Sequence, residues 1–262
     1  MFVTVINDCA DGNTFGRQAT RLATLFPNTA INLVRINNYS EIEAAGNLID
    51  MLDASNGEEG VILVNSAPRH AKKWPNGTPF GYFWYRKTLV IATIDGYCLS
   101  LIKKLNLAPQ IMLTDVPTVA QSLLKQGYID KTLSEQIART QFRSYDYMPR
   151  LARWVIDKWD IPYEQYTFHN VIDVPHAIWL IDNFGNAKTT ILPEEINFKA
   201  GKKIKTRFGT FICSTQMRDV AVGDSALIIG SSGIADKRFI ELIVLGGRAV
   251  DTFNLKSGDL LF

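Results

Sequence analysis

The strongest constraint on the fold is a change of hydrophobic pattern along the chain. In the first half, short apolar runs such as 2–6 and 60–66 alternate with segments of helical periodicity such as 14–26 and 40–52. Strands that alternate with helices in this way form a mainly parallel sheet with helices on both faces. We therefore expect an α/β domain at the N-terminus.

A different pattern follows the mostly helical stretch 116–159 and the helix-breaking Pro162. Short strand-like runs are then separated by Gly, Asn and Asp turns. The runs are 176–181, 187–192, 203–214, 224–230 and 239–245. This pattern is typical of a small antiparallel sheet or barrel. We expect an α/β domain over 1–165 and a smaller antiparallel β-barrel-like domain over 166–262.

Composition argues against several classes of protein. Lys plus Arg number 28 and Asp plus Glu 26, so the chain lacks the basic excess that is typical of a nucleic-acid binder. Cys9, Cys98 and Cys213 are too far apart for a disulfide framework or a zinc knuckle. The N-terminus has no signal-peptide pattern, and no apolar run reaches the ~18 residues of a membrane helix. We expect a cytoplasmic protein with neither nucleic acid nor membrane as a partner.

The loop "INDCADGN" (6–13) follows the first expected strand. In an open α/β sheet this loop lies at the edge where ligands bind. Asp8 and Asp11 could accept hydrogen bonds from paired hydroxyls such as those of a ribose, although Asp, Asn and Gly also favour an ordinary turn. Neither a GxGxxG fingerprint nor a P-loop is present.

Three further segments carry side chains that could be functional, but each segment also has a purely structural interpretation. Segment 65–77 carries Arg69 and could be an exposed excursion, and segment 141–150 carries Ser144 without a nucleophile elbow and could be a helix corner. The "GSSG" phrase at 230–233 could hold a carboxylate through backbone N–H groups or could be a flexible turn. The three histidines lack metal-ligand spacing, so we expect no metal site.

The phrase "IDNFGNAKTTI" (181–191) has the form of a strand, a turn and a strand. Its centre combines Asp182, Phe184, Gly185 and Asn186, whereas a plain hairpin needs only the glycine and one polar residue. The extra aromatic and polar side chains raise the question whether this turn is a plain connection or a binding site.

In their order along the chain, these motifs resemble the S-adenosylmethionine (SAM) hydroxide adenosyltransferase, fluorinase and chlorinase superfamily. The similar phrases are "INDCADGN", "TIDGYCLSL", "QFRSYDYMP", "IDNFGNAKTTI", "GSSGIADKRFIELIVLGGRA" and "NLKSGDLL". The resemblance spans nearly the whole chain, and its two C-terminal motifs are specific whereas the N-terminal ones are eroded.

The resemblance implies a SAM site. Its SAM-binding residues would be Asp8, Asp11, Tyr39, Phe142, Asp182, Phe184, Asn186, Ser231, Ser232 and Gly247. Asp8 matches the aspartate that binds the ribose diol, Asp182 would meet the methionine end and Asn186 the adenine, and Ser231 with Ser232 would hold the carboxylate. The resemblance further implies a homotrimer with SAM between one subunit's α/β domain and its neighbour's β domain, and no cofactor beyond SAM, the substrate.

The resemblance also indicates which residues would contact the nucleophile. Family members that use hydroxide carry an Asp-Arg-His set, and the matching positions here are Asn65 or Ser66, Arg69 and Arg143. Ser144 falls where the fluorinase has the serine that contacts its nucleophile. The predicted catalytic residues are therefore Asn65, Ser66, Arg69, Arg143 and Ser144, although the Asp and His of the set are replaced.

The predicted activity is cleavage of SAM by water at the ribose C5′, which gives adenosine and L-methionine. Such an enzyme must hold C5′ in line with the nucleophile and remove the hydration shell of that nucleophile. Halide transfer, which gives a 5′-halo-5′-deoxyadenosine, is an alternative. A non-catalytic SAM or adenosine binder is another, because the water-activating set is incomplete.

Overall fold

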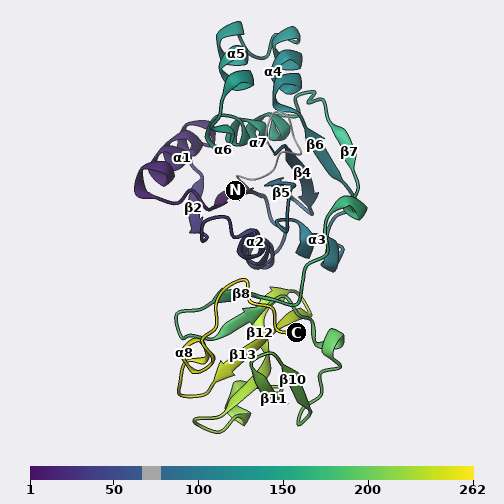
Figure 1. Ribbon diagram of the computed structural model, residues 1–262. Coiled ribbons are helices and arrows are strands. Elements are labelled where there is room, and N and C mark those ends of the chain that lie inside the picture. Colours follow the sequence, from purple (N-terminus) through teal and green to yellow (C-terminus); the bar gives the residue numbers. More distant parts are fainter. Residues whose placement is uncertain (67–77) are drawn as a thin grey trace. The chain divides into compact units, whose positions relative to one another are not determined.

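The computed structural model describes residues 1–66 and 78–262 (Figure 1). The chain falls into two compact units, Met1–Ile172 and Asp173–Phe262. The sequence pattern placed this division at 165, but β7 (Glu164–Tyr166) still pairs with β6 of the first sheet. Each unit has its own sheet, so the expected α/β domain followed by a separate β domain is confirmed.

The first unit contains a mixed sheet with strand order β2-β1-β3-β5-β4-β6-β7. Its other strands are β1 (Phe2–Asn7), β2 (Ala30–Arg35), β3 (Gly60–Asn65), β4 (Phe80–Tyr85), β5 (Thr88–Thr93) and β6 (Ile111–Thr114). The pairs β1–β2, β1–β3 and β3–β5 are parallel. Strand β4 is antiparallel to both β5 and β6, and β7 is antiparallel to β6. The sheet therefore contains more antiparallel pairing than the sequence pattern predicted.

Helices cover both faces of this sheet (Figure 1). They are α1 (Gly12–Leu25), α2 (Glu41–Ser55), α3 (Ser100–Leu105), α4 (Val116–Lys125), α5 (Lys131–Arg139), α6 (Arg143–Asp146), α7 (Met148–Ile156) and the 3₁₀ helix η1 (Phe168–Asn170). Leu22 of α1 and Leu151 of α7 share a buried core with Val5 and Leu63 of the sheet. Helix α2 contacts β1 and β3 and buries a separate set of side chains, as expected when the chain crosses from β2 back over β1.

The order of the first three strands creates a topological switch point. The chain moves from β1 to β2 on one side, and β3 then pairs with β1 on the other side. Ligands of open α/β sheets bind outside the carboxyl ends of the strands at such a point. The residues that follow β1 and β3 are therefore the first place to expect a ligand.

The second unit contains a six-stranded sheet with order β10-β11-β12-β13-β9-β8. Its strands are β8 (Ile178–Ile181), β9 (Ala187–Thr189), β10 (Lys203–Thr206), β11 (Gly209–Ser214), β12 (Ser225–Ile234) and β13 (Lys237–Val244). Its helices are α8 (Ala249–Phe253) and the 3₁₀ helices η2 (Pro193–Ile196) and η3 (Met217–Asp219). Only the β11–β12 pair is parallel among these paired strands, so the sheet is rich in antiparallel pairing.

The "GSSG" phrase is not the flexible turn that was one of its two interpretations. Residues 230–233 lie inside β12, where the pairing with β13 shifts register between Ile229 and Gly233. The chain reverses later, at Ala235, whose φ is +51°. A β-bulge of this kind leaves backbone groups out of the ladder, which is a common device beside binding sites.

The hairpin of "IDNFGNAKTTI" depends on a glycine. Gly185 has a φ of +81°, and a Cβ atom placed on it would lie 2.8 Å from the Cβ of Arg248. We expect Gly185→Ala to lower the free energy of unfolding by about 1–3 kcal/mol. Gly16 is the matched control, because it lies within α1 and an added Cβ would meet nothing within 4 Å.

Gly16→Ala is expected to raise stability by about 1 kcal/mol through helix propensity alone. Urea unfolding of both variants checks the pair. Equal stability of Gly185→Ala and the unmodified protein would show that the turn tolerates a side chain.

Candidate functional site

Polar residues end the strands at the switch point. Asn7 and Asn65 are in register at the ends of β1 and β3, and Asn65 Nδ2 donates to Asn7 Oδ1 at 2.9 Å. The backbone N–H of Asp8 donates to the carbonyl of Asn65 at 3.2 Å. These bonds fix the position of Asp8 relative to β3.

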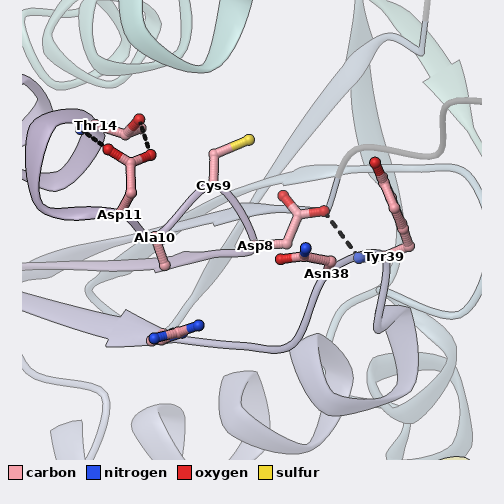
Figure 2. Close-up of a pocket in the computed structure, with 8 residues that line it drawn as sticks. Asp8, Cys9, Ala10, Asp11, Thr14, Asn38 and Tyr39 are labelled. Carbon is pink, nitrogen blue, oxygen red and sulfur yellow. Dashed lines mark hydrogen bonds between the residues drawn. The ribbon is translucent and has the colours of Figure 1, made fainter.

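Asp8 lies in a pocket of about 570 Å³ at this edge (Figure 2). The lining residues are Asp8, Cys9, Ala10, Asp11, Thr14, Arg35, Asn38 and Tyr39. The volume lies within the ~300–1,000 Å³ of small-molecule sites. The structure thus brings together three predicted residues, Asp8, Asp11 and Tyr39.

The backbone of Tyr39 is held by the carboxylate of Asp8. Tyr39 N donates to Asp8 Oδ2 at 3.2 Å, and Figure 2 shows the Tyr39 side chain standing beside that carboxylate. Tyr39 has a φ of +62° and is 50% exposed. A half-exposed ring beside a carboxylate provides an aromatic wall and a hydroxyl-binding group for one ligand.

Asp11 has a structural role that the sequence left open. As the N-cap of α1 it accepts bonds from Thr14 N at 3.0 Å and from Thr14 Oγ1 at 2.6 Å. These hydrogen bonds hold the pKa of Asp11 below its usual value. Both of its oxygens are engaged with Thr14, so Asp8 is the better acceptor for a ligand diol.

Sequence reasoning missed Arg35 and Asn38 in this pocket. Arg35 ends β2, which runs parallel to β1, so its carboxyl end reaches the same edge of the sheet. The sequence pattern of the second strand indicates that Arg35 lies near its end. That Arg35 lines the pocket follows only from the order of the strands in the sheet, which no local motif reveals.

Ser66 is a buried polar residue that directly follows β3. It is 0% exposed, and its backbone N–H lies 3.5 Å from Thr93 Oγ1. Its hydroxyl has no hydrogen-bond partner among residues 1–66 and 78–262. Buried hydroxyls nearly always have a partner, so this one is a candidate to bind water or a ligand atom. Arg69, the next residue of the predicted set, lies outside the described residues.

Arg143 reaches the same sheet edge from α6. Its Nη1 donates at 2.8 Å to the carbonyl of Thr78, which lies just before β4. The first residue of β4, Phe80, pairs with Thr93 at the end of β5. Burial lowers the pKa of Arg143, but a guanidinium remains protonated at neutral pH. It therefore brings a positive charge to this edge.

The neighbours of Arg143 in the predicted set differ in exposure. Ser144 is partly buried on α6, whereas Phe142, the residue before this helix, is 65% exposed. Because the Phe142 ring is largely exposed, it can contact a ligand only at the surface of the first unit.

A partly buried carboxylate fixes the turn that follows β5. Glu41 Oε2 accepts from the backbone N–H of Tyr97 at 2.8 Å. Burial, and secondarily Asp95, raise the pKa of Glu41 above its usual value. Glu41 is the carboxylate at the start of α2 that sequence reasoning did not single out.

In the second unit, Asp182 organises the hairpin between β8 and β9. Its Oδ1 accepts from the backbone N–H groups of Phe184 and Asn186, each at 2.9 Å. Its Oδ2 accepts from Asn186 Nδ2 at 3.2 Å. These bonds present Phe184 at the tip of the turn, where it is 77% exposed.

Arg248 ties this turn to the segment before α8. Its Nη1 donates to the carbonyl of Asn183 at 3.1 Å, and the N–H of Val250 donates to the carbonyl of Gly185 at 2.9 Å. The exposed Gly247 precedes Arg248, so the structure brings Gly247 close to the hairpin.

The serines of the bulge lie on the same sheet. Arg238 Nη1 donates to the carbonyls of Ser231 and Gly233, both at 3.1 Å. Ser232 is buried and Ser231 is exposed. Strand β13 pairs with both β12 and β9, so it connects the bulge to the strand that follows the hairpin.

The fold and the pocket define a class: a two-unit protein with an α/β unit that carries a small-molecule pocket at its switch point, and a β unit rich in antiparallel pairing. Residues 176–262 match the family model of the SAM hydroxide adenosyltransferase C-terminal domain. The second unit is therefore similar to that domain, which confirms the resemblance seen in the motifs. The match supports SAM processing as the general activity.

Two solved structures share the fold over nearly the whole chain. An uncharacterized conserved protein from Thermotoga maritima aligns with a TM-score of 0.71 at 14% identity and covers 98% of each chain. A conserved hypothetical protein from Thermus thermophilus aligns with a TM-score of 0.62 at 16% identity, over 98% of this chain and 96% of its own. No curated protein matches.

Neither a metal site nor a membrane span is evident in the described parts of the chain. Within residues 1–66 and 78–262, no group of three His, Cys, Asp or Glu side chains is arranged to hold a metal ion. Over the same residues, no helix has the length and apolar character needed to cross a membrane.

Proposed function

We propose that the protein cleaves SAM by nucleophilic substitution at the ribose C5′, with water as the nucleophile and without a further cofactor. The products are adenosine and L-methionine, and one proton is released to solvent. The observation that supports this most is the Asp8 carboxylate in the switch-point pocket of a chain whose second unit matches the SAM hydroxide adenosyltransferase C-terminal domain.

Each predicted group has a task in this reaction. The sulfonium of SAM makes C5′ electrophilic and methionine leaves with the electron pair of the broken C–S bond. Asp8 accepts hydrogen bonds from the ribose hydroxyls, and Arg143 lowers the energy of the oxygen anion that develops on the attacking water. The hydroxyls of Ser66 and Ser144 orient that water, although they are poor bases. The rate should therefore be slow.

Halide transfer is the second candidate function. A corner formed by Arg143 and Ser144 would suit a halide as well as a hydroxide, because both are small anions. The test is to incubate the pure protein with SAM, with and without chloride, and to identify the nucleoside by mass spectrometry. Adenosine in both samples supports the hydrolase, and a 5′-chloro nucleoside only with chloride supports the halogenase. Bound but uncleaved SAM after hours would support a non-catalytic binder.

We propose that the active form is a homotrimer in which the two groups of SAM-binding residues come from different subunits. Phe184 is an aromatic side chain on a turn and is 77% exposed. Large exposed apolar groups often mark contact surfaces. Light scattering should report three chains, and a fully active monomer would contradict this arrangement.

The cysteines allow an independent test of the pocket. Cys9 lines it and is partly exposed, whereas Cys98 and Cys213 are buried. Burial raises the pKa of Cys98 to about 12 and also raises that of Cys213. Because the thiolate is the reactive form, iodoacetamide should modify Cys9 alone in the native protein.

SAM or adenosine should slow that modification at least fivefold if it occupies the Asp8 pocket. Peptide mass spectrometry after timed alkylation measures the rate. Inosine at the same concentration, which differs at the base, serves as the comparison ligand. An alkylation rate of Cys9 that saturating SAM leaves unchanged would place SAM elsewhere.

A further inference from the structure

A second hollow lies on the first unit, between α1 and α6. It has a volume of about 540 Å³. The lining residues are Gly12, Asn13, Gly16, Arg17, Thr20, Arg21, Thr24 and Tyr145. None of them lines the Asp8 pocket, and none belongs to the predicted SAM site. In Figure 1 the two helices lie next to each other, and they are in contact.

Two arginines crowd around one tyrosine in this hollow. The guanidinium carbons of Arg17 and Arg21 lie 4.4 Å and 4.6 Å from the centre of the Tyr145 ring. Arg21 Nη2 also donates to the Tyr145 hydroxyl at 2.9 Å, which is the main reason that the pKa of Tyr145 is lowered. Two like charges held by one ring repel each other, and an anion between them would relieve that repulsion.

The nearest carboxylate does not neutralise the pair. Asp146 Oδ1 lies 4.0 Å from Arg21 Nη2 and also 4.0 Å from Arg150 Nη1, so it is shared between two guanidiniums. Three arginines and one aspartate leave a positive excess at the hollow. The exposed Arg17 is the member nearest to solvent.

The hydrogen-bond donors that remain point to an anion as the ligand. Thr20 Oγ1 donates to the carbonyl of Gly16, and Thr24 Oγ1 donates to the carbonyl of Arg21, so both hydroxyl protons are used within α1. A guanidinium has five N–H groups, and the Tyr145 hydroxyl accepts from Arg21 while its own proton can still be donated. The donors available to a ligand therefore come from the two arginines and the tyrosine.

The glycines of α1 keep this hollow open. Gly12 and Gly16 lie in the helix, where glycine is unfavourable, and a Cβ on either would meet nothing within 4 Å. Neither packing nor an unusual backbone angle requires these glycines. Their effect is to leave the floor of the hollow without side chains.

We propose that the Arg17–Arg21–Tyr145 hollow binds a small phosphoryl anion, such as inorganic phosphate or a phosphate ester. A tetrahedral dianion has enough acceptor oxygens for two guanidiniums and one hydroxyl, and arginine suits phosphate geometry. A nucleic-acid backbone fits less well, because the remaining lining residues are uncharged and do not extend the basic surface.

Isothermal titration with inorganic phosphate and with pyrophosphate, at constant ionic strength, tests this site. The unmodified protein should give saturable binding, and Arg17→Ala should weaken it at least tenfold. Arg17→Gln provides a second variant of similar length if the alanine variant folds poorly. Arg139→Ala on the exposed face of α5 removes the same charge elsewhere and should leave the affinity unchanged.

Two further arms distinguish a phosphate site in this hollow from phosphate bound in the Asp8 pocket and from a nucleic-acid surface. Asp8→Ala should leave phosphate binding intact, which makes the result independent of the SAM reaction. A short DNA duplex should bind no better than phosphate. The proposal is overturned if neither phosphate nor pyrophosphate binds, if Arg17→Ala and Arg139→Ala behave alike, or if the duplex binds far more tightly.

Discussion

Replacing Asp8 by alanine is expected to weaken the binding of SAM and of adenosine by about 10- to 100-fold, which corresponds to ~1–3 kcal/mol for lost hydrogen bonds to a buried ligand group. The expectation rests on the position of Asp8 at the end of β1, where its carboxylate lines the switch-point pocket. Isothermal titration measures both affinities.

Two variants separate the ligand contact from the structural role of this carboxylate. Asp8→Asn keeps an oxygen that can accept from Tyr39 N but removes the charge, so it should retain the loop and lose part of the affinity. Asp160→Ala, at an exposed position outside the pocket, should bind SAM normally. Full affinity in Asp8→Ala would remove the proposed ribose contact.

Replacing Arg143 by alanine should lower the turnover of SAM by about 100-fold or more while weakening SAM binding only slightly. Removing one group that stabilises a developing oxygen anion commonly costs about 10²–10³ in rate. Arg143 is partly buried beside the Thr78 carbonyl, so its charge is poorly screened by water. Adenosine release, measured by chromatography, gives the rate, and titration gives the affinity.

Arg143→Lys tests whether charge alone suffices. A lysine keeps the charge but lacks the planar fork of donors, so partial recovery of turnover is expected. Arg139→Ala is again the charge-matched control, with full turnover. Arg143→Ala with the turnover of the unmodified protein would show that this guanidinium does not act on the nucleophile.

The sequence predicted the local elements of the first unit better than their pairing. The first three strands and α1 and α2 follow from runs of apolar residues and from helical periodicity. Strands β6 and β7 were not predicted, because β6 pairs with β4 and β7 pairs with β6, and each of these antiparallel partners lies far along the chain. Pairing over such distances leaves no local signal.

The residues of the candidate site could likewise be predicted only where the local sequence carries a signal. Asp8 and Asp182 could be singled out because each lies in a short polar phrase beside a strand. The hydrogen bonds of Asp182 within its own turn, and the place of Arg35 in the Asp8 pocket, depend on side-chain geometry and strand order. The bulge at Ser231 was not predicted, because Gly and Ser are also common in flexible turns.

The bond between the Asp8 carboxylate and the backbone of Tyr39 makes the pocket preorganised. Tyr39 stays in a left-handed conformation that costs a non-glycine residue about 1–2 kcal/mol, and the carboxylate that binds its N–H stabilises that geometry before any ligand arrives. A ligand that meets an aromatic wall already in place loses less conformational entropy on binding. Ligand recognition and the pose of the aromatic wall are therefore thermodynamically coupled through a single side chain.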